Sequence, residues 1–299
     1  MTLREVGEEK LLEQLLPHFH TSGDAVVPAG DDCAVFRFPG ARDYLVLKTD
    51  CVVEAVHFEP NAPASAVGWK AMMRTLSDFA AMSAVPRFAL VTLMAPPRTN
   101  ASWVRALYRG LNRAAARFDV AIAGGETSAI AQSRAITVSA AGYVEPDRCV
   151  SRSGGKAGNE LFVTGELGGA VNGRHLKFVP RVIEARWLTR QFQIDAMMDL
   201  SDGLGSDLPR LARASKLSFE IDHEALPYAR RCTYEQAISD GEDYELLFAI
   251  APRLTGDLQK RWRKKFPKLR LTRIGKLTSC LPVAARKLPP GYVHFQERR

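Results

Sequence analysis

Segments with a strand-like apolar pattern alternate with segments of helical spacing along most of the chain. Residues 44–47 and 51–56 favour strands, because short runs of apolar and β-branched residues are typical of strands. Between Ser65 and Met82, apolar side chains instead recur every three or four residues, which predicts an amphipathic helix. The alternation continues to a last expected strand near residues 271–274. The pattern therefore predicts an α/β protein.

The other expected elements follow the same two periods. Strands are expected at 89–94, 120–123, 135–144, 161–164, 217–221 and 244–250, and helices at 102–118, 180–192 and 204–214. The strand at 120–123 is short and apolar, so we expect it to be buried. Gly124 and Gly125 are then expected directly after that strand, where a backbone without side chains could approach a phosphate.

Length and local composition predict two domains. The chain has 299 residues, about twice the length of a typical single domain. The most polar and glycine-rich stretch near mid-chain runs from Arg148 to Asn159, which makes it the best boundary. We therefore expect one αβ domain at residues 1–147 and a second at residues 148–299.

The sequence gives no sign of a membrane protein or a disulfide-stabilised one. The first ten residues carry acids and lack an apolar core, and the apolar stretch from Phe79 to Pro97 is interrupted by Pro86 and Arg87. Five cysteines, an odd number with no C-x-x-C pair, are typical of reduced thiols. We expect the protein to be cytoplasmic.

The net charge of +8 raises the question of a nucleic-acid partner. Part of the excess lies in the run Lys260–Lys265, and such runs are most often the solvated face of a helix. A basic surface also attracts phosphorylated small molecules over long distances. A nucleic-acid partner is therefore not expected, although docking on RNA stays open as an alternative.

Six short motifs place carboxylates beside a glycine or at the edge of an apolar run. They are Gly30-Asp31-Asp32, Thr49-Asp50, Leu76-Ser77-Asp78, Gly124-Gly125-Glu126, Asp199-Leu200-Ser201-Asp202-Gly203 and Asp240-Gly241-Glu242-Asp243. Each motif alone could be an ordinary turn or a helix cap. Several converging carboxylates would repel one another without a cation, and Mg²⁺ prefers oxygen ligands. The only histidine near an acidic motif is His57, so zinc is disfavoured.

The common nucleotide-binding loops are missing from the sequence. It contains neither G-x-x-x-x-G-K-[ST] nor G-x-G-x-x-G, so a P-loop or a dinucleotide-binding fold is not expected. A phosphate site would have to be built differently, from backbone near Gly125 and from the guanidinium of Arg152.

The ordered set of motifs resembles that of the thiamine-monophosphate kinases, members of the aminoimidazole ribonucleotide synthetase-like superfamily. The resemblance runs from about Gly7 to Phe295. The acidic motifs above carry it, together with Val52-Val53-Glu54-Ala55-Val56-His57-Phe58, Arg152-Ser153-Gly154 and Gly291-Tyr292-Val293-His294-Phe295.

The resemblance implies an ATP-dependent enzyme that phosphorylates thiamine monophosphate to thiamine diphosphate by direct in-line transfer with magnesium. It also implies two αβ domains and a homodimer formed through the N-terminal sheet. Residues implied to hold magnesium are Asp32, Thr49, Asp50, Asp78, Glu126, Asp199 and Asp202, of which Asp50, Asp78 and Asp199 are central to catalysis. Implied ATP contacts are Gly125, Glu126, Arg152 and Ser201. Implied contacts to the thiamine part are His57, Glu242 and Tyr292.

Four departures from the family pattern bear on activity. Glu126 stands where the family usually has an aspartate, and Asp240 replaces a glycine. Lys48 stands where a small hydroxyl residue is common, and a cation there would lower the number or affinity of bound ions. The segment after Gly165 is shortened. A divergent paralogue that binds nucleotide or thiamine phosphates without turnover is therefore an alternative, as is another ATP-using enzyme of the superfamily.

Overall fold

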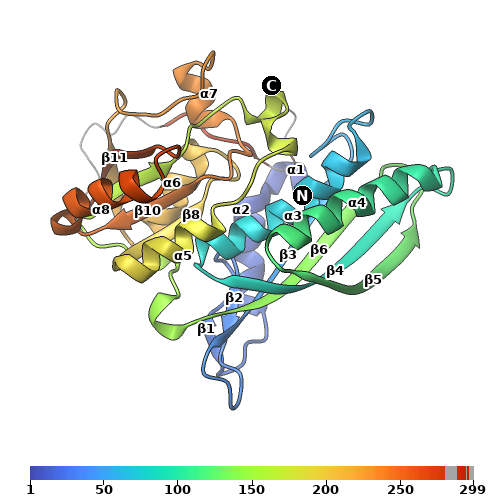
Figure 1. The fold of residues 1–299 in the computed structure, drawn as a ribbon, viewed down its shortest axis with the longest axis horizontal. Coiled ribbons are helices and arrows are strands. Elements are labelled where there is room, and N and C mark those ends of the chain that lie inside the picture. The colour runs from blue at the N-terminus through green and yellow to red at the C-terminus, as the bar shows by residue number, and fades with distance from the viewer. Residues whose placement is uncertain (280–287, 294, 296–299) are drawn as a thin grey trace.

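The computed structural model describes residues 1–279, 288–293 and 295, and these residues form two β-sheets with helices packed on them (Figure 1). The first sheet has six strands in the order β1-β2-β3-β6-β4-β5. Its strands are β1 (Ala25–Val27), β2 (Ala34–Phe36), β3 (Tyr44–Val53), β4 (Val85–Ala95), β5 (Ala121–Ala129) and β6 (Ala135–Val144). Neighbouring strands are antiparallel except for the parallel pair β4 and β5.

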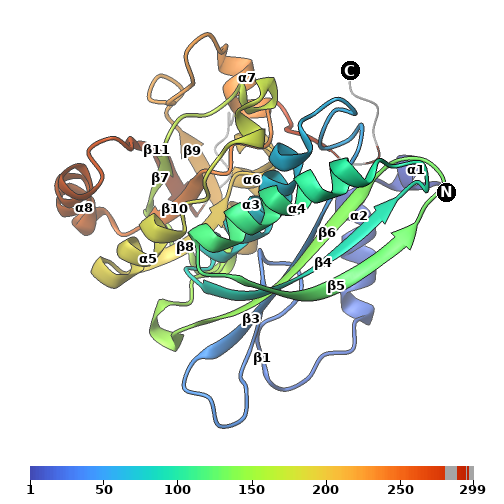
Figure 2. The same ribbon diagram turned by 45° about the vertical axis from the view of Figure 1, so that its right-hand side comes forward.

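Two long helices lie on one face of this sheet, α3 (Ala64–Ala81) and α4 (Ala101–Arg117) (Figure 2). They approach closely because each has a glycine at the crossing. A Cβ on Gly68 would lie 2.1 Å from the carbonyl oxygen of Leu107, and a Cβ on Gly110 would lie 2.0 Å from that of Ser65. The helix α3 also packs against the second half of the molecule, so it lies between the two sheets.

The second sheet has five antiparallel strands in the order β8-β10-β7-β11-β9. These strands are β7 (Glu160–Thr164), β8 (Ile194–Asp199), β9 (Ser218–Ile221), β10 (Leu246–Ile250) and β11 (Leu271–Thr278). Apolar side chains of α6 (Leu204–Ala214) and α7 (Tyr234–Ser239) cover one face. Those of α5 (Val182–Gln191) and α8 (Pro252–Lys265) cover the other. The predicted α/β class is confirmed.

The remaining elements are short. They are α1 (Leu3–Val6), α2 (Glu8–Leu15) and the 3-10 turns η1 (Leu16–His18), η2 (Pro146–Arg148), η3 (Arg152–Gly154), η4 (Ala170–Asn172) and η5 (Arg174–Leu176). The sheets are built from residues 25–144 and 160–278, and the proposed division at residue 147 stays a prediction. Helix α8 buries Trp262 and leaves Lys260, Arg263, Lys264 and Lys265 exposed, as expected for a solvated helix face.

Two sequence-based expectations about strands need correction. The strands expected at 44–47 and 51–56 form one strand, β3, which ends at Val53. The expectation of a buried strand at 120–123 that ends before Gly124 is wrong about both the burial and the end of the strand. Strand β5 continues through Gly124 and Gly125. It is exposed because it is the edge of the sheet, where it pairs with β4 alone among the described strands. Apolar composition alone does not distinguish an edge strand from a central one.

Two further expectations concern thiols and membranes. Among the described cysteines, Cys33, Cys51, Cys149 and Cys232 are all free, as expected for reduced thiols, and Cys280 lies outside the described residues. Within the described ranges, no helix has both the length and the apolar content needed to cross a bilayer.

The glycine contact between α3 and α4 leads to a stability prediction. In Gly68→Ala the added methyl would meet backbone rather than a movable side chain, so the helices must separate. We expect the free energy of unfolding to fall by about 2 kcal/mol. The matched control is Gly256→Ala on α8, where nothing lies within 4 Å of the new methyl. That change should stabilise by up to about 1 kcal/mol. Urea unfolding followed by circular dichroism compares the two, and an equal shift in both would contradict the packing argument.

Candidate active site

Helix α3 carries three charged residues on one buried stripe. Lys70, Arg74 and Asp78 are spaced four residues apart, which places their side chains on the same helix face. Lys70 is fully buried, and Asp78 is nearly so. Because α3 lies between the two sheets, this stripe is where residues from both halves of the chain meet.

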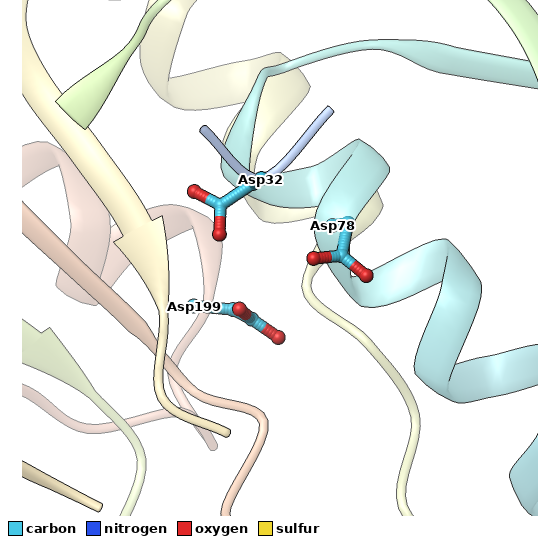
Figure 3. Close-up of side chains that lie close together, drawn as sticks. All are labelled: Asp32, Asp78 and Asp199. Atoms are coloured by element: carbon cyan, nitrogen blue, oxygen red, sulfur yellow. The ribbon is translucent and has the colours of Figure 1, made fainter. Parts of the chain in front are cut away.

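Three buried aspartates converge at the C-terminal end of this stripe (Figure 3). Asp32 comes from the loop before β2, Asp78 from α3 and Asp199 from the end of β8. Each offers a carboxylate oxygen, and these oxygens lie within 4.8 Å of one another. The hydroxyl of Ser77 donates a 2.5 Å hydrogen bond to Asp199 and so fixes its orientation. The motifs that were far apart in the sequence therefore form one acidic cluster.

Cationic side chains border the cluster. The ammonium of Lys48 lies 2.9 Å from Oδ1 of Asp78 and 4.0 Å from Oδ1 of Asp50. The guanidinium of Arg152 pairs with Asp32, and its backbone N–H donates to Asp31 at 3.1 Å. Lys48 and Asp50 are both on the α3 side of strand β3, because alternate residues of a strand share a face.

These cations do not neutralise the cluster completely. Burial and the neighbouring charge of Asp32 raise the pKa of Asp199 to about 7, and burial raises the pKa of Asp78 well above its usual value. Burial also opposes ionisation of Asp50, but Lys48 and Arg74 outweigh it and lower its pKa. The Oδ2 atom of Asp50 is buried without a hydrogen-bond partner. The site therefore has carboxylate oxygens to spare for a further cation.

The cluster opens into a polar cleft of about 550 Å³. Arg152 and Arg210 supply positive charge on its wall, and Ser201 and Asp202 also line it. Asp202 pairs with Arg210 and is not among the three clustered aspartates, so its predicted role as a metal ligand stays a prediction. A cleft with both carboxylates and guanidinium groups suits a metal-bound polyphosphate.

A smaller cavity lies beside the cleft. Its lining includes His57, Glu242 and Tyr292, the three residues predicted to contact the thiamine part. Tyr244 forms part of the wall and stacks on Phe178 with ring centroids 4.0 Å apart. The structure therefore brings His57 together with Glu242 and Tyr292, which lie 185 and 235 positions further along the chain.

A buried network holds Glu242 at this cavity. Lys70 donates to its two carboxylate oxygens at 2.6 and 2.7 Å, and to the carbonyl oxygen of His57 at 2.5 Å. Nδ1 of His175 lies 2.6 Å from Glu242. The sequence suggested that His57 is the only histidine near an acidic motif, but in the fold His175 also lies beside one. Burial opposes ionisation of Glu242, yet the hydrogen bond with His175 and the charge of Lys70 lower its pKa to about 2.

The backbone is also strained at this cavity. Glu242 and Tyr244 have φ values of 70° and 52°, in the left-handed region that non-glycine residues rarely adopt. Their N–H groups donate to the carbonyl oxygens of Ser201 and Leu200, at 2.7 and 2.8 Å. These bonds hold the strained segment against the chain that follows Asp199. Strain of this kind persists where the surrounding structure fixes it, often at functional sites.

Three predicted residues lie apart from the cluster. Thr49 borders the cleft, but its hydroxyl is on the other face of the sheet, 2.9 Å from that of Ser139. Glu126 is exposed on β5, three strands from β3, a separation of about 14 Å. Gly125 packs directly against β4, since a Cβ added to it would lie 1.8 Å from the carbonyl oxygen of Val91. Within one chain, these residues do not reach the acidic cluster.

Two of the departures from the family pattern, Asp240 and the shortened segment after Gly165, lie together and are joined by hydrogen bonds. Asp240 accepts a 2.9 Å hydrogen bond from the N–H of Gly169, and Asp243 accepts one of the same length from the N–H of Gly168. Arg174 pairs with Asp243 at 2.6 Å. The short segment is thus tied to the strained Glu242 region, and it brings His175 to the Glu242 carboxylate.

Sequence reasoning missed Lys70, Arg74 and His175 as site residues. The available signal for the first two was their spacing: charged residues four apart, in phase with Asp78, on a helix whose other inward positions are apolar. No local signal marks His175, which reaches Glu242 only through the fold of its segment.

Comparison with known proteins settles the family. Models of the AIR synthase related proteins match residues 30–144, as the N-terminal domain, and 156–279, as the C-terminal domain. The curated thiamine-monophosphate kinase of Rhodopirellula baltica is 34% identical over 313 residues, covering 96% of this chain and 97% of that protein. The chain belongs to the thiamine-monophosphate kinase family. The Bacillus subtilis kinase is 33% identical over 82% of this chain and 84% of its own length.

Solved structures of thiamine-monophosphate kinases share the whole fold. AaThiL complexed with AMPPCP and TMP superposes with a TM-score of 0.85 and 30% identity, covering 98% of this chain and 99% of that one. The thiamine-monophosphate kinase from Stenotrophomonas maltophilia has a TM-score of 0.74 and 27% identity, covering 96% of each chain. The chain is thus an enzyme of the thiamine-monophosphate kinase family with both of its domains.

The lowered pKa of Glu242 leads to a pH prediction. A carboxyl group with a depressed native pKa stabilises the fold above its unfolded pKa, near 4.5, and this stabilisation is lost as pH falls toward 2. We expect Glu242→Gln to lower the free energy of unfolding at pH 7 by on the order of 3 kcal/mol. The difference from wild type should shrink between pH 4.5 and 2.

The measurement is denaturant unfolding at a series of pH values, with Glu59→Gln as the control. Glu59 is exposed, so its substitution should leave the stability nearly unchanged at every pH. A Glu242→Gln deficit that does not vary with pH would show that the ion pair with Lys70 is not its source.

Proposed function

We propose that this enzyme transfers the terminal phosphoryl group of ATP to thiamine monophosphate, giving thiamine diphosphate and ADP. The observation that carries the proposal is that the polar cleft and the smaller cavity share a wall, formed by Arg74, Ser201, Asp202 and Tyr244. A donor phosphate chain in the cleft and an acceptor ring in the cavity would therefore meet at one place. The names of its relatives, and the AMPPCP and TMP bound in AaThiL, support this choice of substrates.

The acidic cluster fits magnesium. All of its ligands are carboxylate oxygens, and Oδ2 of Asp50 is a buried acceptor without a partner. Asp32, Asp50, Asp78 and Asp199 are the residues that would hold the ions. Magnesium bound there supplies positive charge that neutralises the phosphates and favours attack at phosphorus.

The chain itself would act mainly by positioning. Arg152 and Ser201 face the cleft, where a guanidinium fork and a hydroxyl suit phosphate oxygens. In direct in-line transfer, an oxygen of the acceptor phosphate forms a bond to the γ-phosphorus as the bond to the bridging oxygen of ADP breaks. The attacking oxygen is already anionic, so no side chain has to become a covalent intermediate.

A homodimer and a cytoplasmic location belong to the same proposal. The sheet face opposite α3 and α4 exposes large apolar side chains, among them Leu47, Phe88, Leu90 and Tyr143. A contiguous apolar surface of this kind is typical of an interface. Thr49 and Glu126 lie on that face, so their predicted roles would require a second subunit. The division at residues 147 and 148 is proposed as the boundary between the two domains.

The kinase proposal predicts the outcome of a substrate assay. Purified protein with ATP, magnesium and thiamine monophosphate should yield ADP and thiamine diphosphate. Asp78→Asn should reduce turnover by on the order of 10³-fold or more, because it removes a carboxylate that would hold the ions. The matched control is Asp119→Asn, since that carboxylate is 86% exposed and remote from the cleft.

Thiamine diphosphate is measured by chromatography, and the fold of each variant by circular dichroism. Nucleotide binding without product at any magnesium concentration would contradict the kinase proposal. It would instead favour the alternative that the chain is a binding protein without turnover.

Lys48 leads to a prediction about metal affinity. Its ammonium forms an ion pair with the carboxylate of Asp78 and lies near that of Asp50, so it competes with an added cation for the same oxygens. We expect Lys48→Met to bind Mn²⁺, used as a probe for magnesium, about tenfold more tightly or with one more ion per chain. Titration by electron paramagnetic resonance gives both quantities. Lys156→Met is the control because Lys156 is 71% exposed and pairs with Asp195 outside the cluster. Identical titrations for Lys48→Met and wild type would refute the competition.

A further inference from the structure

Arg74 lies where the polar cleft and the smaller cavity meet. It lines the cavity with His57 and Glu242, and it also lines the cleft with Asp50 and Asp78. Helix α3 explains this placement. Lys70, one turn earlier, holds Glu242 at the cavity, whereas Asp78, one turn later, belongs to the acidic cluster. Four helical residues span about 6 Å, so the guanidinium of Arg74 is between the two sites.

The guanidinium of Arg74 is only partly engaged. Its ion pair is with Asp50, where Nε lies 3.6 Å from Oδ1, a distance too long for a hydrogen bond. Within the part of the chain that the structure describes, this guanidinium donates no hydrogen bond to another residue. By contrast, the guanidinium groups of Arg152 and Arg210 both donate to carboxylates. Arg74 therefore has N–H donors left for a ligand, and its side chain is 17% exposed.

A guanidinium in this position suits a phosphate. It is permanently charged, and its planar fork matches two phosphate oxygens at once. A substrate whose ring fills the cavity would have to extend its phosphate past the shared wall to reach the cleft. Arg74 is the cationic residue of that wall, since the other three are Ser201, Asp202 and Tyr244.

We propose that Arg74 binds the phosphate that the acceptor already carries, and so makes the site selective for a phosphomonoester over the free alcohol. This inference rests on the proposed function and adds a residue that determines its specificity. The alternative is that Arg74 serves only as a counter-ion that keeps Asp50 ionised. The long contact with Asp50 and the unused donors favour the phosphate role.

Binding measurements on the full chain separate the two roles. Thiamine monophosphate and thiamine are titrated by calorimetry into wild type, Arg74→Met and Arg74→Lys, in EDTA so that no metal holds the phosphate. We expect Arg74→Met to bind thiamine monophosphate about 10- to 100-fold more weakly while its affinity for thiamine stays within about threefold. Arg74→Lys keeps the charge and loses the fork, so it should fall between wild type and Arg74→Met.

The control is Arg109→Met, which removes the same charge from an exposed position on α4 and should bind both ligands like wild type. Equal losses for both ligands, unchanged affinities, or wild type that does not prefer thiamine monophosphate over thiamine would each overturn the role of Arg74. If wild type still forms thiamine diphosphate in the substrate assay, such a result leaves the proposed function standing. Wild type that neither binds nor phosphorylates thiamine monophosphate would refute both.

Discussion

The burial of charge along α3 is the constraint on which the rest of the structure depends. Lys70 is completely enclosed, and an isolated ammonium in such a place would cost several kcal/mol. It is tolerated because Glu242, His175 and the carbonyl of His57 surround it. These partners come from three separate segments, so the ion pair requires both halves of the chain to be folded and in register. The same contacts that satisfy Lys70 also shape the smaller cavity.

The strained segment around Glu242 shows how this requirement extends to the backbone. Left-handed conformations at Glu242 and Tyr244 cost on the order of 1 kcal/mol or more each. A relaxed backbone would move the Glu242 carboxylate away from Lys70 and leave that buried ammonium without its counter-ion. The energetic cost of the strain is smaller than that of an unpaired buried charge, so the strained conformation is favoured. Strain here is therefore a consequence of charge pairing and fixes the cavity wall.

The sequence predicted the chemistry of the site better than its geometry. The acids of the Asp32, Asp78 and Asp199 motifs were recognisable because each sits in a local pattern, and their order along the chain identified the family. The pairing of Lys70 with Glu242 was not predictable, since 172 positions separate them and no local sequence pattern around either residue indicates the other. Similarly, the apolar residues of β5 predicted a buried strand, but the sheet order makes it an edge. Local pattern encodes an element, whereas its neighbours are decided by the whole fold.

The arrangement of cations around the cluster follows from the same electrostatics. Lys48 and Arg74 both approach Asp50, from a strand and from a helix, and Arg152 approaches Asp32 from the second half of the chain. Each cation lowers the repulsion among buried carboxylates, yet Asp78 and Asp199 still have raised pKa values because burial and neighbouring acids outweigh that help. A site that were purely structural would be more stable with fewer acids or with complete pairing. The remaining negative charge is what the proposed site for metal-bound phosphate requires. In its proposed role, the guanidinium of Arg74 would turn from Asp50 to a ligand, and Lys48 would stay beside that carboxylate.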